Sequence, residues 1–428
     1  MKPFKTFAAL ILTFIALTSF AGAQTNIVRI TGSTAFRGAV HTAISNLMPG
    51  ATVGFAGTSL NGANQAVFTG NMTGVAGTTV VKTSWAGSVG GVQTLTQNLT
   101  IATWLQNGAS GSGLTGPYDA PVTADVTMSD SFQGSTAFTT PGLTSKIVGV
   151  IVFEWVANNG SPTPIGTPGK PLATAAVATG DPANNYYPGL TNISLLQAKN
   201  LLAGGLPLSQ FTGIGSESLG VYCVGRDEDS GTRLVAYAES KYGVFTSPTQ
   251  YQPSINGTPG VGATVTALNP WPQATVLGTV YPVGHSGYNS GGSLADALAT
   301  PGSSTATNGG WIVSYLGRND ATRACSGAGN TAHRLTYNGV ADWTDGTSTI
   351  PGGAGVAADD ASVIEGKYTF WSYEHLMYRS GFAGATVANL IADRIKNFDA
   401  TVSGIKLSAM HVGRTVEGGE VTFGNPFP

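Results

Sequence analysis

The feature that most constrains the fold is a regular alternation of extended and helical segments along the chain. Segments with strand patterns, either alternating or continuously apolar, are followed by segments whose apolar residues recur three and four positions apart. Strands are expected at 26–31, 78–85, 124–129, 146–157, 220–226 and 310–316, and helices at 40–48, 92–106, 194–202, 232–242 and 387–398. This alternation is typical of an α/β protein, in which helices flank a sheet.

Four stretches do not follow the alternation, namely 50–76, 107–123, 159–189 and 245–275. They are rich in Gly, Thr, Pro and Asn, and several of these residue types favour turns. We therefore expect them to form long surface loops or insertions. No internal repeat stands out, which disfavours a solenoid.

Charged residues are scarce, and this excludes several classes of protein. Only 10% of the residues are Asp, Glu, Lys or Arg, where about 25% is usual, so the charged flanking positions of a coiled coil are missing. The formal net charge is -2 without any Lys/Arg cluster, and nucleic acid is therefore not an expected partner. A hydrophobic content of 42% argues against a disordered chain, and the 60 glycines lack a collagen period.

The N-terminus has the pattern of a secretory signal peptide. Lys2 and Lys5 precede an apolar stretch, 7–20, which is followed by the small residues Ala21-Gly22-Ala23. The alternative is an uncleaved membrane anchor, but the stretch is short for a bilayer span. We expect residues 1–23 to be removed and the mature protein to be periplasmic or secreted. No cysteine follows the cleavage site, so a lipoprotein anchor is not expected.

The chain has two cysteines, Cys223 and Cys325. Export permits a disulfide between them, and two separate buried thiols are an equally good alternative. The five histidines are scattered and no CxxC or HExxH motif is present. Neither a metal site nor a cofactor is therefore expected.

Three turns between an expected strand and an expected helix have the chemistry of anion sites. They are Gly32-Ser33-Thr34, Gly87-Ser88-Val89-Gly90-Gly91 and Ser230-Gly231-Thr232. Each places hydroxyl groups and unpaired backbone N–H groups at a helix N-terminus, which attracts anions. The alternative for any one of them is ordinary helix capping by Ser or Thr.

An arginine precedes the third turn, in the segment Val224-Gly-Arg-Asp-Glu-Asp-Ser-Gly-Thr232. Arg226 offers a fixed fork of donors for an oxyanion. At least one of the acids 227–229 is expected to pair with Arg226 and hold its fork in place. A calcium loop is the rival interpretation, but the segment lacks a Glu at the twelfth position.

The pattern R-x-x-x-S-G-T after a strand resembles the phosphate-binding proteins of bacterial phosphate ABC transporters, which have the type II periplasmic binding protein fold. Other segments resemble the family in the same order along most of the mature chain. They are Gly32-Ser33-Thr34, Trp85–Val92, Asp125–Asp130, Leu190–Gly204, Gly309–Tyr315 and Tyr368–Tyr373. The chain departs from the family at Ala35, where Phe is frequent, and in its long Gly/Thr-rich stretches.

The resemblance implies a two-lobed α/β protein with mixed sheets that binds inorganic phosphate between its lobes. Lobe I would comprise residues 24–148 plus 372–428, and lobe II residues 149–371. The resemblance implies no enzymatic activity, an ABC transporter permease as a possible partner, and a monomer. The family's phosphate ligands fall on Thr34, the backbone N–H of Ala35, Ser88, Asp130, Arg226, Ser230, Gly231 and Thr232.

Asp130 would select the ligand. A carboxylate tolerates an anion that can donate a proton to it, as phosphate does near neutral pH and sulfate does not. A buried Asp130 facing sulfate would place two like charges together without a hydrogen bond, at a cost of several kcal/mol. The alternative role for Asp130 is to cap its own loop.

Two other functions fit parts of the sequence. A secreted phosphatase would use the same anion chemistry, but no metal cluster or activated nucleophile is visible. A surface or matrix protein that reuses the fold would explain the low charge and the Gly/Thr-rich stretches. The segments 111–116 (GxGxxG) and 284–287 (GHSG) are expected to be turns, because neither has the context of a dinucleotide or nucleophile motif.

Overall fold

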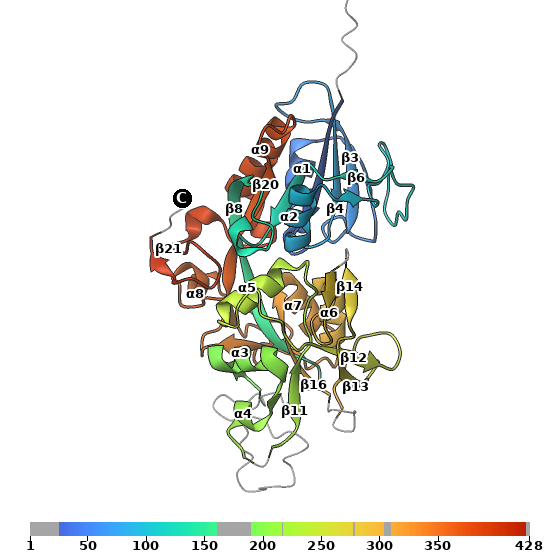
Figure 1. Ribbon diagram of the computed structural model, residues 1–428. Helices are drawn as coiled ribbons and strands as arrows, with labels where there is room; N and C mark the ends of the chain where they lie inside the picture. Colours follow the sequence, from blue (N-terminus) through green and yellow to red (C-terminus); the bar gives the residue numbers. More distant parts are fainter. Residues whose placement is uncertain (1–24, 161–189, 216, 277–278, 304–309, 425–428) are drawn as a thin grey trace, which may run out of the picture.

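The computed structural model describes residues 25–160, 190–215, 217–276, 279–303 and 310–424. The expected signal peptide and most of the stretch 159–189 lie outside the described residues. The described chain forms two bodies, one above the other in Figure 1, and each combines strands with helices. The expected α/β fold with a large mixed sheet flanked by helices is confirmed. In the described part of the chain, no helix is both long and apolar enough to cross a membrane.

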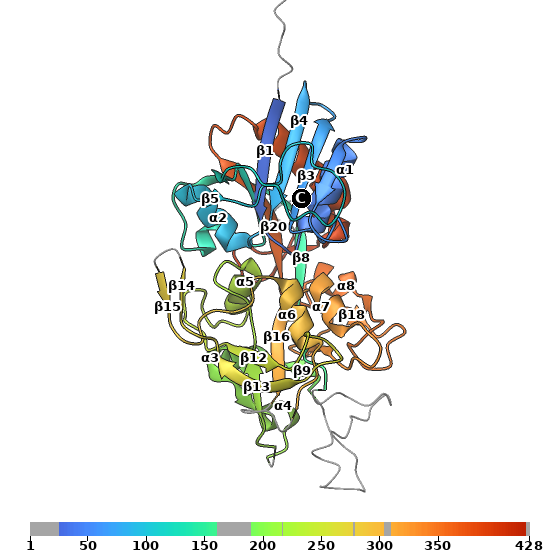
Figure 2. The same cartoon turned by 90° about the vertical axis from the view of Figure 1, so that its right-hand side faces the viewer.

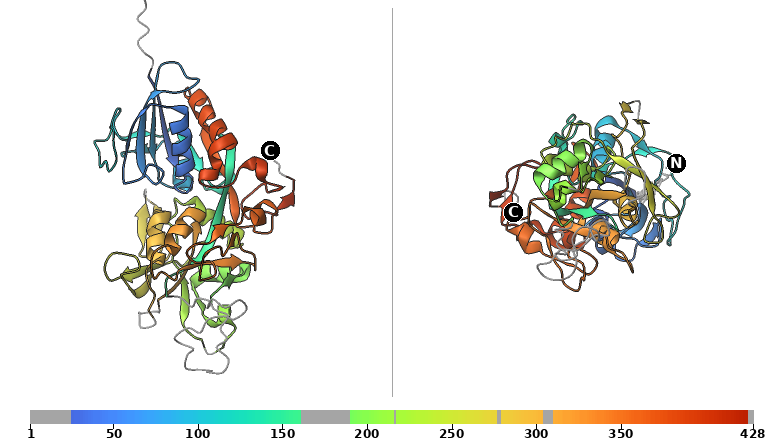
Figure 3. Two further views of the ribbon diagram at one scale, coloured as in Figure 1. Left: turned by 180° about the vertical axis from the view of Figure 1, so that it is seen from behind. Right: turned by 90° about the horizontal axis from the view of Figure 1, so that it is seen from below.

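The upper body, which we call lobe I, is built on neighbouring parallel strands. The strand β1 (Thr25–Gly32) lies between β4 (Thr78–Ser84) and β7 (Val126–Ser129), parallel to both. The helices α1 (Arg37–Leu47) and α9 (Ala385–Arg394) cover one face of this sheet. The helix α2 (Ser88–Gln97) covers the other face (Figures 1 and 3).

The lower body, lobe II, is a smaller sheet between two pairs of helices. Its strands are the end of β8 (Leu143–Ala157), β16 (Trp311–Gly317), β11 (Gly220–Cys223) and β17 (His333–Tyr337). Figure 2 shows one helix pair on each side of β16. The pairs are α3 (Leu195–Gly204) with α5 (Gly231–Glu239), and α6 (Gly291–Leu298) with α7 (Arg318–Cys325).

The strand β8 connects the two lobes into one sheet. Its residues 143–152 pair with β20 (Trp371–Arg379) of lobe I, whereas 153–157 pair with β16 of lobe II. Every residue from Val148 to Ala157 is buried, as this mainly apolar run predicts, and Glu154 within it is buried as well. The main hydrophobic core therefore continues through the junction.

Two stretches expected to be loops contain strands of four or more residues, and a third, 107–123, contains only the two-residue strand β6 (Val122–Thr123). The stretch 50–76 holds β2 (Thr52–Phe55) and β3 (Gln65–Asn71), which extend the lobe I sheet beyond β4. The stretch 245–275 holds a hairpin of β12 (Tyr251–Ile255) and β13 (Val265–Pro270). Threonine favours strands as well as turns, so a Thr-rich composition does not separate the two.

The second helix also differs from its expected bounds. It begins at Ser88, directly in the Gly-rich turn, and ends at Gln97 because Asn98 adopts a left-handed conformation.

The remaining short elements are β5 (Thr100–Ile101), β6 (Val122–Thr123), β9 (Asn192–Ile193), β10 (Leu206–Pro207), α4 (Ser209–Thr212), β14 (Ala274–Val276), β15 (Thr279–Tyr281), β18 (Trp343–Thr344), β19 (Ala357–Ala358), α8 (Asp360–Ile364), β21 (Val412–Gly413) and β22 (Thr422–Phe423), with single turns of other helix types at Gln133–Ser135, Ile395–Asp399, Ala400–Val402 and Leu407–Ala409.

Cys223 and Cys325 are separate buried thiols, so the structure has the second of the two alternatives. Burial raises the pKa of each thiol to about 12. Both side chains act as small core residues at the ends of β11 and α7.

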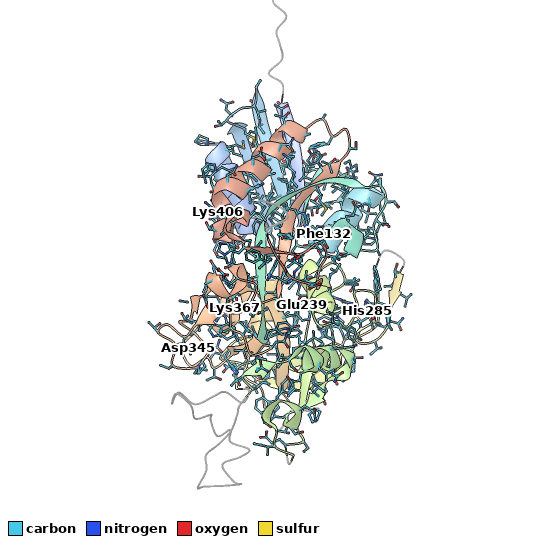
Figure 4. All side chains as sticks on the ribbon, turned by 90° about the vertical axis from the view of Figure 1, so that its left-hand side faces the viewer. Phe132, Glu239, His285, Asp345, Lys367 and Lys406 are labelled. Atoms are coloured by element: carbon cyan, nitrogen blue, oxygen red, sulfur yellow. The ribbon has the colours of Figure 1, made fainter. Side chains whose placement is uncertain are left out.

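The C-terminal segment 405–424 contacts both lobes. Glu417 accepts a hydrogen bond from the Phe132 amide of lobe I at 2.6 Å. Arg414 donates to Glu239 of lobe II at 2.9 Å. Figure 4 labels Phe132 and Glu239 on the two sides of the junction. This segment, expected to belong to lobe I, therefore bridges the lobes.

Candidate anion site between the two lobes

The carboxyl ends of the central strands of both lobes face the junction. In lobe I, Ser33, Ser88 and Asp130 follow the ends of β1, β4 and β7. In lobe II, Arg226 and Ser230 lie between the end of β11 and the start of α5. Since loops at the carboxyl ends of parallel strands meet at one edge of a sheet, the fold brings these segments together.

Four of the predicted residues, Ser88, Asp130, Gly231 and Thr232, are in direct contact, and we call them the Asp130 cluster. The Asp130 amide donates to Ser88 Oγ at 3.2 Å, and Thr232 Oγ1 donates to Asp130 Oδ2 at 3.4 Å. A Cβ atom on Gly231 would lie 1.6 Å from Asp130 Oδ1 and 2.7 Å from Ser88 Oγ. Only glycine therefore fits at this point of the lobe interface.

Asp130 is the buried carboxyl group of the cluster. Its side chain is 1% exposed, and its Oδ1 atom has no hydrogen-bond partner. Burial raises the pKa of Asp130 to about 6, while the Ser88 hydrogen bond, the charge of Arg226 and the Thr232 hydrogen bond oppose that rise. Near neutral pH the group is thus a carboxylate with a free acceptor oxygen.

The charge of Arg226 in lobe II acts on Asp130, but the Arg226 side chain is not held as expected. Its Nε donates to the Tyr288 carbonyl at 2.9 Å, and its Nη2 donates to the Asn289 carbonyl at 3.1 Å. The prediction that an acid of 227–229 holds the fork is wrong. Two backbone carbonyls orient the guanidinium instead, and they do so without neutralising its charge.

The backbone of Arg226 is fixed by side chains that the sequence did not single out. The Arg226 amide donates to the Tyr315 hydroxyl at 3.2 Å, and that hydroxyl donates to Gln250 Oε1 at 2.7 Å. Gln250 Nε2 and Arg233 Nη1 both donate to the Arg226 carbonyl, at 2.9 and 3.1 Å. These hydrogen bonds require a glycine at position 225, because a Cβ there would lie 1.7 Å from Gln250 Oε1.

The neighbouring acids have other partners or remain buried. Glu228 accepts from Ser286 Oγ at 3.0 Å and lies 3.9 Å from Arg233. Burial raises the pKa of Asp227 to about 7. Across the described ranges, no group of three or more His, Cys, Asp or Glu side chains could hold a metal ion.

The N-terminus of α2 contacts protein rather than offering free amides. The amides of Val89 and Gly90 donate to the Asp229 carbonyl of lobe II at 2.9 and 3.2 Å. The expectation that this turn presents unpaired N–H groups to an anion is therefore wrong for these two amides. They form a direct hydrogen-bonded link between the lobes, beside the Asp130 cluster.

The N-terminus of α5 keeps the expected character. Ser230 caps the helix, and its Oγ accepts from the Arg233 amide at 3.2 Å. The amides of Gly231 and Thr232 fall in the first turn, where a helix has no acceptor of its own. Both residues belong to the Asp130 cluster, and their amides add partial positive charge there.

Thr34 and Ala35 lie in the turn before α1, at the lobe interface. Thr34 is buried, and Ala35 is half-buried beside Gly317 of lobe II. The adjacent Ser33 has a contact that the sequence did not predict, because its Oγ donates to Glu374 Oε2 at 3.2 Å. The first turn thus reaches a second buried carboxyl group.

Two cavities of the described structure differ in their relation to the candidate site. One, of about 140 Å³, lies at the lobe interface between Val89 and Ser135 of lobe I and Ser230 and Arg233 of lobe II. A larger one, of about 550 Å³, lies on lobe I beside Lys146 and away from the Asp130 cluster. Only the smaller cavity shares residues with the candidate site.

Solved structures similar to this chain include phosphate-binding proteins, some of them described as parts of phosphate ABC transporters. One is a putative phosphate ABC transporter substrate-binding protein with bound phosphate from Clostridium perfringens, with 11% identity, a TM-score of 0.45, and coverage of 89% of this chain and 99% of that one. Another is an ABC-type phosphate transport receptor from Vibrio cholerae, with 12% identity, a TM-score of 0.40, and coverage of 88% and 96%. A possible phosphate binding protein from Planctomyces limnophilus has 11% identity, a TM-score of 0.37, and coverage of 89% and 93%.

A scan against protein-family models finds no match, and a search of curated proteins finds no similar sequence. TM-scores below 0.5 carry no weight for function. The function is therefore inferred from the residues at the lobe interface.

Proposed function

We propose that this protein is an exported solute-binding protein that holds inorganic phosphate between its two lobes. The observation that carries the proposal is the buried carboxyl group of Asp130, whose Oδ1 has no hydrogen-bond partner and on which the charge of Arg226 acts. Two backbone carbonyls fix the orientation of the Arg226 guanidinium. Asp130 would accept a hydrogen bond from the ligand, and Arg226 would supply charge-assisted donors to it.

The proposed ligands are Thr34, Ala35, Ser88, Asp130, Arg226, Ser230, Gly231 and Thr232. We also propose lobe boundaries near residues 148 and 371, with residues 405–424 as a bridge. Removal of residues 1–23, a periplasmic or secreted location, a monomeric state and delivery of phosphate to an ABC transporter permease belong to the same proposal. No catalytic role is assigned to any of these residues.

Calorimetric titration with phosphate and sulfate tests the proposal. We expect the wild-type protein to bind phosphate and to discriminate against sulfate by up to about 10⁴, because sulfate cannot donate a hydrogen bond to Asp130. Asp130→Asn should lose this discrimination more than it loses phosphate affinity. If neither anion gives a binding isotherm, the proposed function is wrong; unchanged selectivity in Asp130→Asn removes Asp130 from its role.

A further inference from the structure

Glu374 is a second carboxyl group at the lobe interface, below the first anion turn. It lies in β20, where the register against β8 shifts between Glu374 and His375. A shift of this kind changes the direction of a side chain. The Glu374 side chain is fully buried, and Ser33 Oγ donates to its Oε2 at 3.2 Å.

Asp130 Oδ1 and Glu374 Oε1 are both buried without a hydrogen-bond partner, as is Asp227 Oδ1 next to Arg226. Burial and the charge of Asp130 raise the pKa of Glu374 well above its usual range, against the opposing effect of the Ser33 hydrogen bond. Two carboxyl groups that share a site do not both ionise at low cost. Asp130 has more groups that favour its charged form, so Glu374 is the one that keeps its proton.

The charges around this pair explain why the proton matters. The charge of Asp130, at the end of β7, acts on Glu374, and it acts on Glu417 of the C-terminal segment as well. Arg226 is the cation that acts on Asp130. Ionisation of Glu374 therefore adds one more negative charge near Asp130 before an anion arrives.

Further charged groups act on Arg226, two from the surrounding elements and two, Asp227 and Asp229, from its own loop. Arg37 lies at the start of α1, and Asp320 lies in α7. Each interacts with the other and with Arg226. Burial raises the pKa of Asp227 to about 7 and that of Asp229 to about 6, so both add negative charge as the pH rises. All these groups remain when Glu374 is replaced, so a comparison of wild type with a Glu374 variant isolates the charge of Glu374.

We propose that Glu374 is a specificity residue of the phosphate site that permits anion binding only in its protonated form. This inference rests on the proposed function. It gives Glu374 a role distinct from that of Asp130, which accepts a proton from the ligand. An acid is protonated below its pKa and charged above it, so phosphate affinity holds at lower pH and falls as Glu374 ionises.

The test is the pH dependence of phosphate affinity, measured by calorimetry between about pH 6 and pH 10. Glu374→Gln has nearly the same shape and cannot ionise. We expect wild type and variant to bind alike at low pH. At high pH the wild type should weaken relative to the variant by up to about tenfold per pH unit.

Two more variants sharpen the test. Ser33→Ala removes a donor that favours ionised Glu374, so the fall in affinity should move to higher pH. Glu217→Gln is the matched control, because Glu217 is a buried glutamate of lobe II that accepts from Thr212. Its pH profile should follow the wild type.

Parallel pH profiles for wild type and Glu374→Gln would overturn the role of Glu374 while leaving the proposed function intact. A wild-type protein that binds no phosphate at any pH overturns the proposed function and this inference together. The two failures are therefore distinguishable in one set of titrations.

Discussion

At the scale of single residues, the candidate site places an acid where an anion has to bind. Burial makes the charged form of Asp130 costly, and the Ser88 and Thr232 hydrogen bonds recover only part of that cost. A group that lowers stability and is nevertheless well ordered by its neighbours is typical of a functional position. The cost of burying the Asp130 carboxylate should be measurable as a lower free energy of unfolding in the absence of ligand.

We predict that Asp130→Asn stabilises the phosphate-free protein at alkaline pH. The native pKa of about 6 exceeds the usual value of 3.8, so the native state binds the proton more tightly than the unfolded chain. The free energy of unfolding of wild type therefore falls as pH rises from about 4 to about 6. The variant avoids this cost, so its free energy of unfolding should exceed that of wild type by up to about 3 kcal/mol at pH 8.

Urea unfolding at several pH values measures this difference, which should shrink below about pH 4. Asp393→Asn is the control, because Asp393 is a surface carboxylate at 61% side-chain exposure. It should show no comparable gain. A variant less stable than wild type at pH 8 would mean that Asp130 serves mainly as a structural acceptor.

At the scale of elements, what the sequence predicted well was local. The apolar run at 146–157 and the Ser-Gly-Thr turn before α5 both depend on neighbours in the chain. What it missed depends on distant partners. Gln250 was expected in a loop and contacts Arg226, and Glu374 contacts Ser33 across 341 positions. Periodicity and motif spacing carry no information on such pairs.

The link between α2 and lobe II yields an element-scale prediction. A Cβ on Gly90 would lie 2.9 Å from Asp229 Cγ and 3.0 Å from its Cβ. Alanine suits the helix better by up to about 1 kcal/mol, so Gly90→Ala should not destabilise lobe I. It should instead separate Asp229 from α2 and weaken phosphate binding about fivefold, the equivalent of one hydrogen bond.

Thermal unfolding and phosphate titration of the same preparation check both halves of this prediction. Gly134→Ala is the matched control in lobe I, because a Cβ there meets nothing within 4 Å. It should change neither quantity. If Gly90→Ala binds phosphate as tightly as Gly134→Ala, the contact between α2 and Asp229 does not contribute to the bound state.

At the scale of the whole molecule, the lobes are joined by a shared sheet and also by the C-terminal segment. Arg414 is 2% exposed, and besides Glu239 it contacts the Thr369 carbonyl at 2.5 Å and the face of Trp371 at 4.2 Å. It therefore ties α5 of lobe II to the start of β20. This tie lies outside the anion site, so its loss should affect stability in the absence of any ligand.

We predict that Arg414→Met lowers the free energy of unfolding by about 3–5 kcal/mol, because it leaves Glu239 buried without its cation. Adding Glu239→Gln should recover much of that loss, since the amide needs no counter-charge. Arg323→Met is the control, because the Arg323–Asp296 pair is 56% and 40% exposed and should contribute at most about 1 kcal/mol. Urea unfolding of the four proteins measures these differences. If Arg414→Met lowers the free energy of unfolding no more than Arg323→Met does, the shared sheet alone holds the lobes together.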